Sequence, residues 1–314
     1  MKICVAGEGA FGTKHIEALC NIESVEVSWL VGGEPNNTQA VAEKFNIANW
    51  SCDLSDALND NDIAGVVLAT PTPIHAAQAK QVMLAGKHVL VEIPMADNLA
   101  DALELVAIQK QTGVIAMAGH VRRFNPSHQW IHNKIQQGEL KIQQMDVQTY
   151  FYRRSNTNAK GEPRSWTDHL LWHHACHSVD LFQYQTGQQV SQCYALQGPI
   201  HAELGIAMDM SIGMKVPDGA LCTLSLSFNN DGPFGTFFRY ICDEGTFTAR
   251  YDDLFNSTDN PIDLSQVAIS SNGIELIDRE FIQAISSGCE PNSSLQQCLG
   301  AMETLHKLEQ SLCP

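Results

Sequence analysis

The first 120 residues alternate short apolar runs with amphipathic stretches. Apolar runs of four to seven residues are typical of buried strands, and they lie at 3–6, 25–31, 64–69, 88–91 and 115–118. Stretches with helical spacing lie between them, at 10–20, 38–45, 74–84 and 99–111. This alternation of strand and helix predicts a parallel, doubly wound sheet with right-handed crossovers.

After residue 120 the pattern changes to longer β-type segments. These lie at 143–153, 190–197, 206–215, 220–228, 237–242 and 246–251, and turn signals such as Asp218-Gly219 separate some of them. Helical spacing returns only at 170–184, 276–286 and 295–312. We therefore expect a Rossmann-type α/β domain over residues 1–120 and an α+β domain with a largely antiparallel sheet over residues 121–314.

Composition narrows the class of protein. Hydrophobic residues make up 44% of the 314 residues and charged residues 17%, which is typical of a globular protein. No run approaches the ~20 apolar residues of a membrane span, and the N-terminus has no charged leader, so we expect a cytoplasmic protein without a membrane partner. The net charge of −16 argues against nucleic-acid binding. The ten cysteines form no C-x-x-C pair, which favours reduced thiols.

A glycine motif follows the first predicted strand and opens the first predicted helix. Residues 7–12 read G-E-G-A-F-G and fit G-x-G-x-x-G. In such a loop the first glycine makes the turn, the second admits a pyrophosphate, the third packs helix on strand, and the helix N-terminus binds the anion. The alternative is a glycine-rich turn without a ligand. In this context we predict dinucleotide binding by Gly7, Gly9, Ala10, Phe11 and Gly12.

The end of the second predicted strand usually distinguishes NAD from NADP. An acidic residue there accepts from the ribose 2′-hydroxyl, and an arginine accommodates a 2′-phosphate. Here the stretch reads Gly32-Gly33-Glu34, with neither residue type at the expected position. Gly32 and Gly33 are expected beside the ribose, and the sequence leaves both cofactors open.

Histidines gather on the predicted helix at 170–184. His173, His177 and Asp180 are spaced i, i+4 and i+7, which places them on one helix face. A histidine is suited to remove the proton of a hydroxyl as hydride leaves the same carbon. Two alternatives are histidines that cap or bond within a core and a zinc site. The third ligand of a zinc motif is not apparent, so we expect no metal.

Basic residues are concentrated between Arg122 and Arg164. This segment holds eight basic and three acidic residues, a net charge of +5 within an acidic chain. Because arginine binds carboxylates bidentately, an anionic substrate is expected here. A solvated charged face is the alternative for any one arginine. Candidate substrate contacts are Arg122, Arg123, Arg153 and Arg164, with Trp166 and Trp172 as walls for a flat substrate or as core residues.

Together these motifs resemble the Gfo/Idh/MocA family of nicotinamide-dependent oxidoreductases over essentially the whole chain. The glycine loop, Thr70-Pro71-Thr72 with His75, Glu92-Ile93-Pro94 and the histidine helix occur in family order. The resemblance implies that Thr70, Pro71, Thr72, His75, Glu92 and Pro94 line the cofactor site. Ile93 stands where the family usually has a lysine. His173 stands where it usually has an aspartate, and His177 matches the catalytic histidine.

Four further segments resemble one subgroup of the family. They are residues 119–126 (GHVRRFNP), 161–166 (GEPRSW), 171–174 (LWHH) and 227–233 (SFNNDGP). The subgroup oxidises the cyclic hemiacetal of 4-carboxy-2-hydroxymuconate-6-semialdehyde to 2-pyrone-4,6-dicarboxylate in the protocatechuate 4,5-cleavage pathway, with NADP and sometimes NAD. Its usual Ser-Arg after the second strand is Gly32-Gly33 here.

The resemblance therefore implies a mechanism. His177 removes the hydroxyl proton, His173 orients His177, and the arginines hold the two carboxylates of a small dicarboxylate. It also implies a homodimer formed through the sheet of the second domain. Two alternatives remain: a sugar or cyclitol dehydrogenase of the same family, which needs no arginine cluster, and a non-catalytic NAD(P)-sensing regulator, which the missing family lysine favours.

Overall fold

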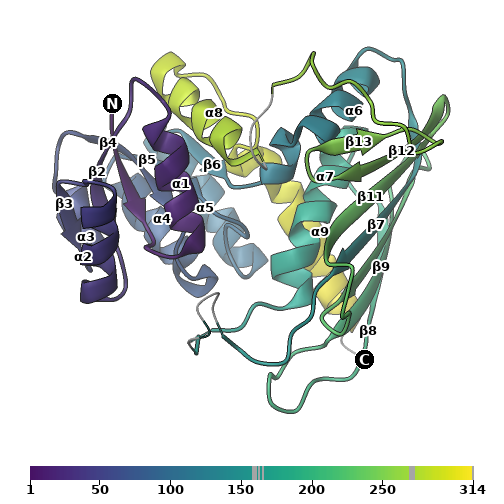
Figure 1. Cartoon of the computed structure of the whole chain (residues 1–314), viewed down its shortest axis with the longest axis horizontal. Helices are drawn as coiled ribbons and strands as arrows, with labels where there is room; N and C mark the ends of the chain where they lie inside the picture. Colours follow the sequence, from purple (N-terminus) through teal and green to yellow (C-terminus); the bar gives the residue numbers. More distant parts are fainter. Residues whose placement is uncertain (158–160, 162, 165, 269–272, 313–314) are drawn as a thin grey trace. The chain divides into compact units, whose positions relative to one another are not determined.

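The computed structural model describes residues 1–157, 161, 163–164, 166–268 and 273–312. Its elements are labelled in Figure 1. The chain divides into two compact units. The first unit contains Met1–His120 and Ile274–Leu299, and the second contains Val121–Gly273 and Gly300–Pro314. A sequence division at residue 120 thus coincides with the first boundary between units, and the chain later returns to the first unit.

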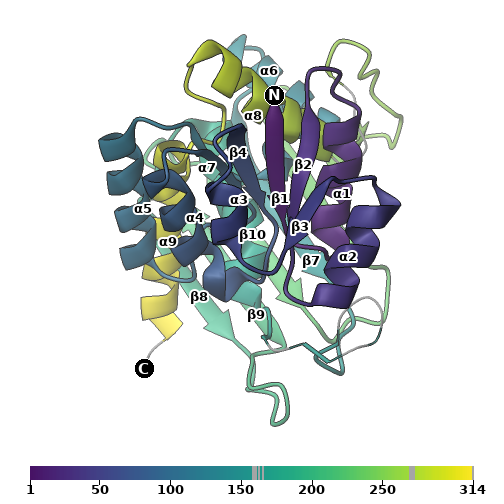
Figure 2. The same cartoon turned by 90° about the vertical axis from the view of Figure 1, so that its left-hand side faces the viewer.

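The first unit has a six-stranded sheet in the order β3-β2-β1-β4-β5-β6, with every neighbouring pair parallel. Figure 2 shows β4, β1 and β2 side by side. The order reverses between β1 and β4, and ligands of such sheets bind beyond the strand carboxyl ends at that point. The strands are β1 (Lys2–Ala6), β2 (Glu26–Val31), β3 (Asn49–Ser51), β4 (Ile63–Leu68), β5 (His88–Val91) and β6 (Ala116–Ala118).

Helices connect these strands. Side chains of Glu34, Asp53 and Asn98 cap the N-termini of α2, α3 and α5, and Gly113 ends α5 in the left-handed conformation. The helical elements are α1 (Ala10–Cys20), α2 (Pro35–Lys44), α3 (Leu54–Leu58), the 3₁₀ turn η1 (Thr72–Ile74), α4 (His75–Leu84), α5 (Leu99–Thr112) and α8 (Ile274–Ser287). α8 packs beside α1 and buries Phe281 near Gly65, which is why this late segment belongs to the first unit.

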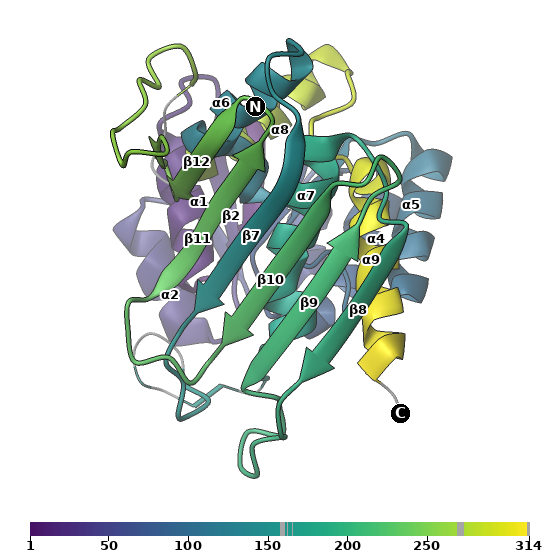
Figure 3. The ribbon, with the colours of Figure 1, turned by 90° about the vertical axis from the view of Figure 1, so that its right-hand side faces the viewer.

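The second unit has a seven-stranded sheet in the order β13-β12-β11-β7-β10-β9-β8. Only the central pair, β7 with β10, is parallel. Figure 3 shows one face of this sheet, and no described helix covers that face. The strands are β7 (Ile142–Tyr150), β8 (Gln192–Gln197), β9 (Asp209–Lys215), β10 (Leu221–Ser227), β11 (Gly235–Cys242), β12 (Gly245–Arg250) and β13 (Asp253–Phe255).

Helices of the second unit cover the other face of its sheet (Figure 3). Strand residues alternate accordingly: Met145 and Val147 of β7 are buried, whereas Gln148 between Val147 and Thr149 is exposed. The helical elements are η2 (Val121–Phe124), α6 (Pro126–Gln136), the π-helical turn η3 (Leu170–Ala175) and α7 (Cys176–Thr186); α9 (Leu295–Leu312) starts in the first unit and continues in this one.

The predicted fold class is confirmed: a parallel doubly wound sheet precedes a largely antiparallel one. The short elements β3, α3 and β13 and the polar helix α6 were not predicted from the hydrophobic pattern. The predicted helix at 170–184 is interrupted, because its first turn is π-helical. Among the described residues, every helix is too short or too polar to cross a lipid bilayer.

Candidate active site

The glycine loop between β1 and α1 has the geometry of a phosphate cradle. Gly7 has a φ of +122°, and a Cβ there would lie 2.3 Å from the carbonyl oxygen of Ala69. A Cβ on Gly12 would lie 1.8 Å from the carbonyl oxygen of Gly7, whereas one on Gly9 would meet no atom within 4 Å. Gly9 caps α1 without a side-chain bond, so the first-turn N–H groups are available to an anion, and the neighbouring Ala10 and Phe11 are exposed. The loop fits a bound pyrophosphate.

An acidic side chain that the sequence did not single out lies at the end of β2. Glu8 Oε1 accepts hydrogen bonds from the backbone N–H groups of Gly33 (3.0 Å) and Glu34 (3.2 Å). A Cβ on Gly32 would lie 2.0 Å from Thr38 Oγ1 and 2.9 Å from Glu8 Oε2. The carboxylate thus lies where a Rossmann domain usually holds its ribose-binding acid, although it comes from the glycine loop.

The loops after β4 and β5 are joined by a buried histidine. His75 Nε2 lies 2.8 Å from the carbonyl oxygen of Thr70, and its Nδ1 lies 2.9 Å from that of Pro94. Pro71 is exposed and Thr72 is buried. The structure therefore brings together the predicted cofactor residues of these two loops at the carboxyl edge of the sheet.

Glu92, at the end of β5, is held by a residue of α1. Its Oε1 lies 2.9 Å from His15 Nε2, and its Oε2 accepts from the N–H of Ile93 at 3.2 Å. His15 Nδ1 in turn lies 2.8 Å from Oδ1 of Asp278 on α8. Sequence reasoning did not single out His15 or Asp278, since their partners are 77 and 263 residues away.

In the second unit, η3 changes the expected geometry of the histidine helix. His173 lies in the π turn, whereas His177 lies in the first turn of α7, and both are half-buried. His173 Nδ1 accepts from the N–H of His169 at 3.1 Å, and its ring stacks on Trp166 with centroids 5.5 Å apart. Asp180, predicted to share their face, is bound bidentately by Arg123 (2.8 and 2.6 Å).

Two of the predicted substrate arginines are buried. Arg123 makes the pair with Asp180 and lies over the ring of Tyr184. Arg122 lies over Tyr251 and donates to Asn125, and burial lowers the pKa of its guanidinium. Trp172 is only 1% exposed, and its indole N–H donates to Glu309 at 2.8 Å.

The other two arginines converge on one carboxylate, Asp168. Arg153 binds it through both terminal nitrogens, Arg164 Nη1 lies 3.1 Å from Oδ1, and His174 Nε2 lies 3.0 Å from Oδ2. Burial alone would raise the pKa of Asp168, but the hydrogen bonds of His174 and Arg153 hold it well below the ordinary value. We name Arg153, Arg164, His174 and Asp168 the basic cluster.

Sequence reasoning found the two arginines of the basic cluster and missed the other members. His174 belongs to the histidine group 173–177, but its spacing gave it no role beside His173 and His177. Asp168 had no sequence signal. Lys160, Glu162 and Ser165, which belong to the basic segment and to the motif at 161–166, lie outside the described residues.

Comparisons with known proteins cover nearly the whole chain. The model of the oxidoreductase family with an NAD-binding Rossmann fold matches residues 1–120, and that of the C-terminal domain of bacterial oxidoreductases matches residues 126–268. The chain is 60% identical over 312 residues, 99% of each protein, to the 4-carboxy-2-hydroxymuconate-6-semialdehyde dehydrogenase of Sphingobium sp. strain NBRC 103272 / SYK-6.

Solved structures share the fold at low sequence identity. The UDP-N-acetylglucosamine 3-dehydrogenase of Acidithiobacillus ferrooxidans superimposes with a TM-score of 0.84 at 18% identity, covering 99% of this chain and 97% of that one. An oxidoreductase from Agrobacterium radiobacter, solved with NAD+, L-tartaric acid and magnesium, gives 0.83 at 16% identity, covering 99% and 96%. The match to the family models and the 60% identity to a relative over 99% of the chain show that the chain belongs to the Gfo/Idh/MocA family of oxidoreductases with an NAD-binding Rossmann fold.

Proposed function

We propose that the protein is a dehydrogenase that oxidises the cyclic hemiacetal of 4-carboxy-2-hydroxymuconate-6-semialdehyde to 2-pyrone-4,6-dicarboxylate. The 60% identity to a dehydrogenase named for this semialdehyde supports the substrate. The structural observation that carries the proposal is the basic cluster, because a dicarboxylate needs fixed cations and a neutral polyol does not.

The basic cluster carries a net positive charge and contains hydrogen-bond donors that Asp168 does not use. Two guanidinium groups and one imidazole surround a single carboxylate, so the net charge is positive. Among the described residues, Arg164 Nη2 and Arg153 Nε make no hydrogen bond, and the side chains of Arg153, Arg164 and His174 are 14%, 22% and 20% exposed. These groups can bind a second carboxylate beside Asp168. We therefore assign substrate recognition to Arg153 and Arg164 rather than to the buried Arg122 and Arg123.

Aromatic residues beside the basic cluster suit a conjugated ring. Arg164 lies over Trp166, with the guanidinium carbon 5.5 Å from the ring centroid, and Trp166 stacks on His173. Trp166 is half-buried, whereas Trp172 is enclosed. We propose Trp166 as the wall against which the flat substrate packs.

The reaction requires removal of one hydride and one proton from the hemiacetal. A bound nicotinamide supplies the hydride acceptor. His177 takes the hydroxyl proton as the carbon loses hydride, and the C–O bond becomes the lactone carbonyl. His173 accepts the His169 N–H at Nδ1, so in its neutral form it carries its proton on Nε2, from which it can orient a partner.

An activity assay tests this function. The purified protein is mixed with the ring-cleavage product and NAD+ or NADP+, and the absorbance of reduced nicotinamide is followed while mass spectrometry identifies the product. We expect formation of the pyrone dicarboxylate and little turnover of myo-inositol or glucose. Preferential oxidation of the neutral polyols would overturn the substrate assignment, and cofactor binding without reduction on any substrate would identify a sensor.

We also propose that NAD is the better cofactor. The carboxylate of Glu8 reaches the end of β2, where Glu34 also lies, and residues 32–38 contain no lysine or arginine. A carboxylate bound to the N–H groups of Gly33 and Glu34 can accept from a ribose 2′-hydroxyl, and it repels a 2′-phosphate. The ratio of kcat/KM for NAD+ to that for NADP+ should fall about tenfold or more in Glu8→Gln. A wild-type preference for NADP+ would refute this proposal.

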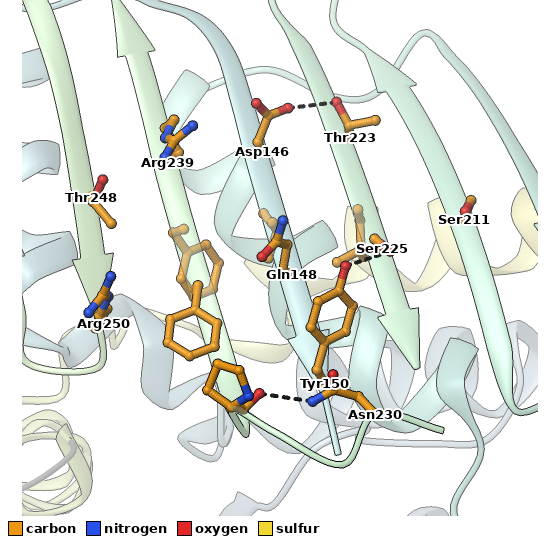
Figure 4. A pocket seen from close by; sticks show the side chains of 15 residues that line it. Asp146, Gln148, Tyr150, Ser211, Thr223, Ser225, Asn230, Arg239, Thr248 and Arg250 are labelled. Atoms are coloured by element: carbon orange, nitrogen blue, oxygen red, sulfur yellow. Dashed lines mark hydrogen bonds between the residues drawn. The ribbon is translucent and has the colours of Figure 1, made fainter. Parts of the chain in front are cut away.

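Finally, we propose a homodimer through the uncovered face of the second sheet. This face has a hollow of about 490 Å³, lined by side chains from β7, β9, β10, β11 and β12. Figure 4 shows these side chains. Tyr194 and Leu196 on β8 are 56% and 67% exposed, and Leu221 on β10 is 45% exposed. Large exposed apolar side chains beside polar ones are typical of protein interfaces.

Light scattering after size-exclusion chromatography measures the mass in solution. We expect a dimer for the wild type and a monomer for Leu196→Glu. The matched control is Leu103→Glu on α5, whose side chain is 46% exposed and lies in the other unit. A monomeric wild type, or dissociation in both variants, would contradict this interface.

A further inference from the structure

Three ionisable side chains of the first unit form a buried chain of contacts. His15 bridges Asp278 and Glu92, with N–O distances of 2.8 and 2.9 Å. The side chains of His15 and Asp278 are fully buried, and that of Glu92 is 15% exposed. The proton transfer assigned to His177 uses none of the three. We name them the acidic relay.

The geometry of the acidic relay favours a protonated His15. Each ring nitrogen of His15 faces a carboxylate oxygen, so both nitrogens can donate only if the ring is an imidazolium. Burial alone would lower the pKa of His15, but Asp278 and Glu92 raise it to about 10. The second oxygen of Asp278 is buried and has no hydrogen-bond partner among the described residues. His15 is therefore the partner that compensates the charge of Asp278.

Counting charges gives the relay a net charge of −1. Asp278 neutralises the imidazolium, which leaves the carboxylate of Glu92 as the excess charge. Glu92 is the most exposed member and directly follows β5 at the carboxyl edge of the sheet. The next residue is Ile93, so the adjacent position contributes no cation. A Cβ on Gly119 would lie 3.0 Å from Glu92 Cδ, so packing also fixes this carboxylate.

We infer that Asp278 and His15 position Glu92 and leave it as an excess negative charge, which makes the first unit bind the oxidised dinucleotide more tightly than the reduced one. The inference rests on the proposed dinucleotide binding. Oxidised nicotinamide carries a positive charge on its ring and reduced nicotinamide is neutral, so a fixed carboxylate at this edge of the sheet stabilises only the oxidised form. Glu92 is the charged group, and His15 and Asp278 are positioning residues.

The positioning role of Asp278 and His15 leads to a prediction that a purely structural role for these buried residues does not. Replacing Asp278 by Asn leaves the imidazolium of His15 to neutralise Glu92. This substitution of a fully buried side chain should therefore weaken the preference for oxidised cofactor as much as Glu92→Gln does. Replacing His15 by Gln in the same protein removes the imidazolium and leaves Glu92 charged. The double variant H15Q/D278N should therefore regain the preference that D278N loses.

Equilibrium titration tests the inference without turnover. Fluorescence of NADH and NADPH measures the reduced-form Kd, and competition with NAD+ and NADP+ measures the oxidised-form Kd, at pH 7. The ratio of reduced-form to oxidised-form Kd should fall about tenfold in E92Q and in D278N, and it should return towards wild type in H15Q/D278N. The matched control is Glu104→Gln, which removes a surface carboxylate paired with Lys80 and should leave the ratio unchanged.

The outcomes distinguish failure of the proposed function from failure of the inference about Glu92. If the wild type binds neither form of either cofactor, the proposed function fails. If both forms bind but the ratio is unchanged in E92Q and D278N, or the double variant does not restore it, the inference is overturned and the function stands. Should D278N fail to fold by circular dichroism, E92Q and E92D decide the question, because E92D keeps the charge and should keep the ratio.

Discussion

Each unit contains a cluster of charged side chains, and the two clusters have net charges of opposite sign. In the acidic relay, one imidazolium lies between two carboxylates. In the basic cluster, one carboxylate lies among two guanidinium groups and an imidazole. The first therefore keeps an excess negative charge and the second an excess positive charge. A protein with a net charge of −16 has concentrated cations in the one unit for which we propose an anionic substrate.

His15 is the central residue of the acidic relay, and Asp168 is that of the basic cluster. His15 and Asp168 are both counter-ions, and removing either leaves buried like charges facing one another. Neither is expected to exchange a proton with a ligand. Their importance is that they fix the side chains around them, which agrees with the general need to hold functional groups rigidly.

The largest expected effect concerns a residue outside both groups. His177→Ala should lower kcat by roughly 10²–10⁴-fold, because a general base contributes about that much, while cofactor affinity stays within about twofold. Steady-state kinetics and cofactor titration measure the two quantities. A near-wild-type kcat would show that the base is elsewhere, and His174→Ala would then be the next variant to measure.

Breaking the acidic relay should cost folding stability. His15→Ala leaves Asp278 buried without compensation and should lower the free energy of unfolding by about 3–5 kcal/mol. The control, Lys80→Ala, breaks the exposed pair with Glu104 and should cost about 0–1 kcal/mol. Urea denaturation measures both. Equal losses in the two variants would contradict the buried role of His15.

Breaking the basic cluster should affect substrate use. Arg153→Gln or Arg164→Gln removes a charged hydrogen bond, so kcat/KM for the dicarboxylate should fall about ten- to a hundredfold, mainly through KM. Arg154→Gln is the matched control, since Arg154 donates to the carbonyl oxygen of Arg153 and to Asn229 from an exposed position. A loss in the control as large as in the other two would argue against a specific carboxylate site.

The smallest effect is a pH dependence of opposite sign in the two units. The pKa of His15 is raised to about 10, so its stabilisation is complete below the unfolded value of about 6.5 and is lost as the pH rises through 10. The pKa of Asp168 is lowered, so its stabilisation is present above about 3.8 and is lost as the pH falls below that value.

Unfolding midpoints in urea over a series of pH values test this sign difference. His15→Gln should flatten the alkaline decline, and Asp168→Asn should flatten the acidic one. If either substitution flattens the decline assigned to the other, the attribution of the pH dependence to these two residues is incorrect.

Local sequence patterns predicted most of the fold. The helices at 10–20 and 295–312 have the predicted bounds, because apolar spacing and Gly9 or Ser294 mark them clearly. The glycine spacing likewise predicted a loop whose Gly7 and Gly12 leave no room for a Cβ. The helix α6 is polar overall, and two of its four buried residues, Ser127 and His128, are themselves polar, so a search for apolar runs does not find it.

The candidate site was less accessible to sequence reasoning. A π turn inserts one residue into the helical repeat, so the i, i+4 spacing of His173 and His177 does not translate into one regular face. Glu8 and Asp278 were missed because their partners lie 25 and 263 residues away. Asp168 was missed although its partners Arg153, Arg164 and His174 lie within 15 residues of it. Arg122 and Arg123 were predicted to contact the substrate, but both are buried, Arg122 beside Asn125 and Tyr251 and Arg123 beside Asp180.

The late return of the chain to its first unit sets an order of events during synthesis. A ribosome that has released residues 1–120 has delivered all six strands of the parallel sheet, but Asp278 and Phe281 are still more than 150 residues from being made. Until α8 emerges, His15 lacks one of its two acids and Gly65 lacks the ring that covers it. The nascent first unit can therefore finish folding only after most of the second has been translated.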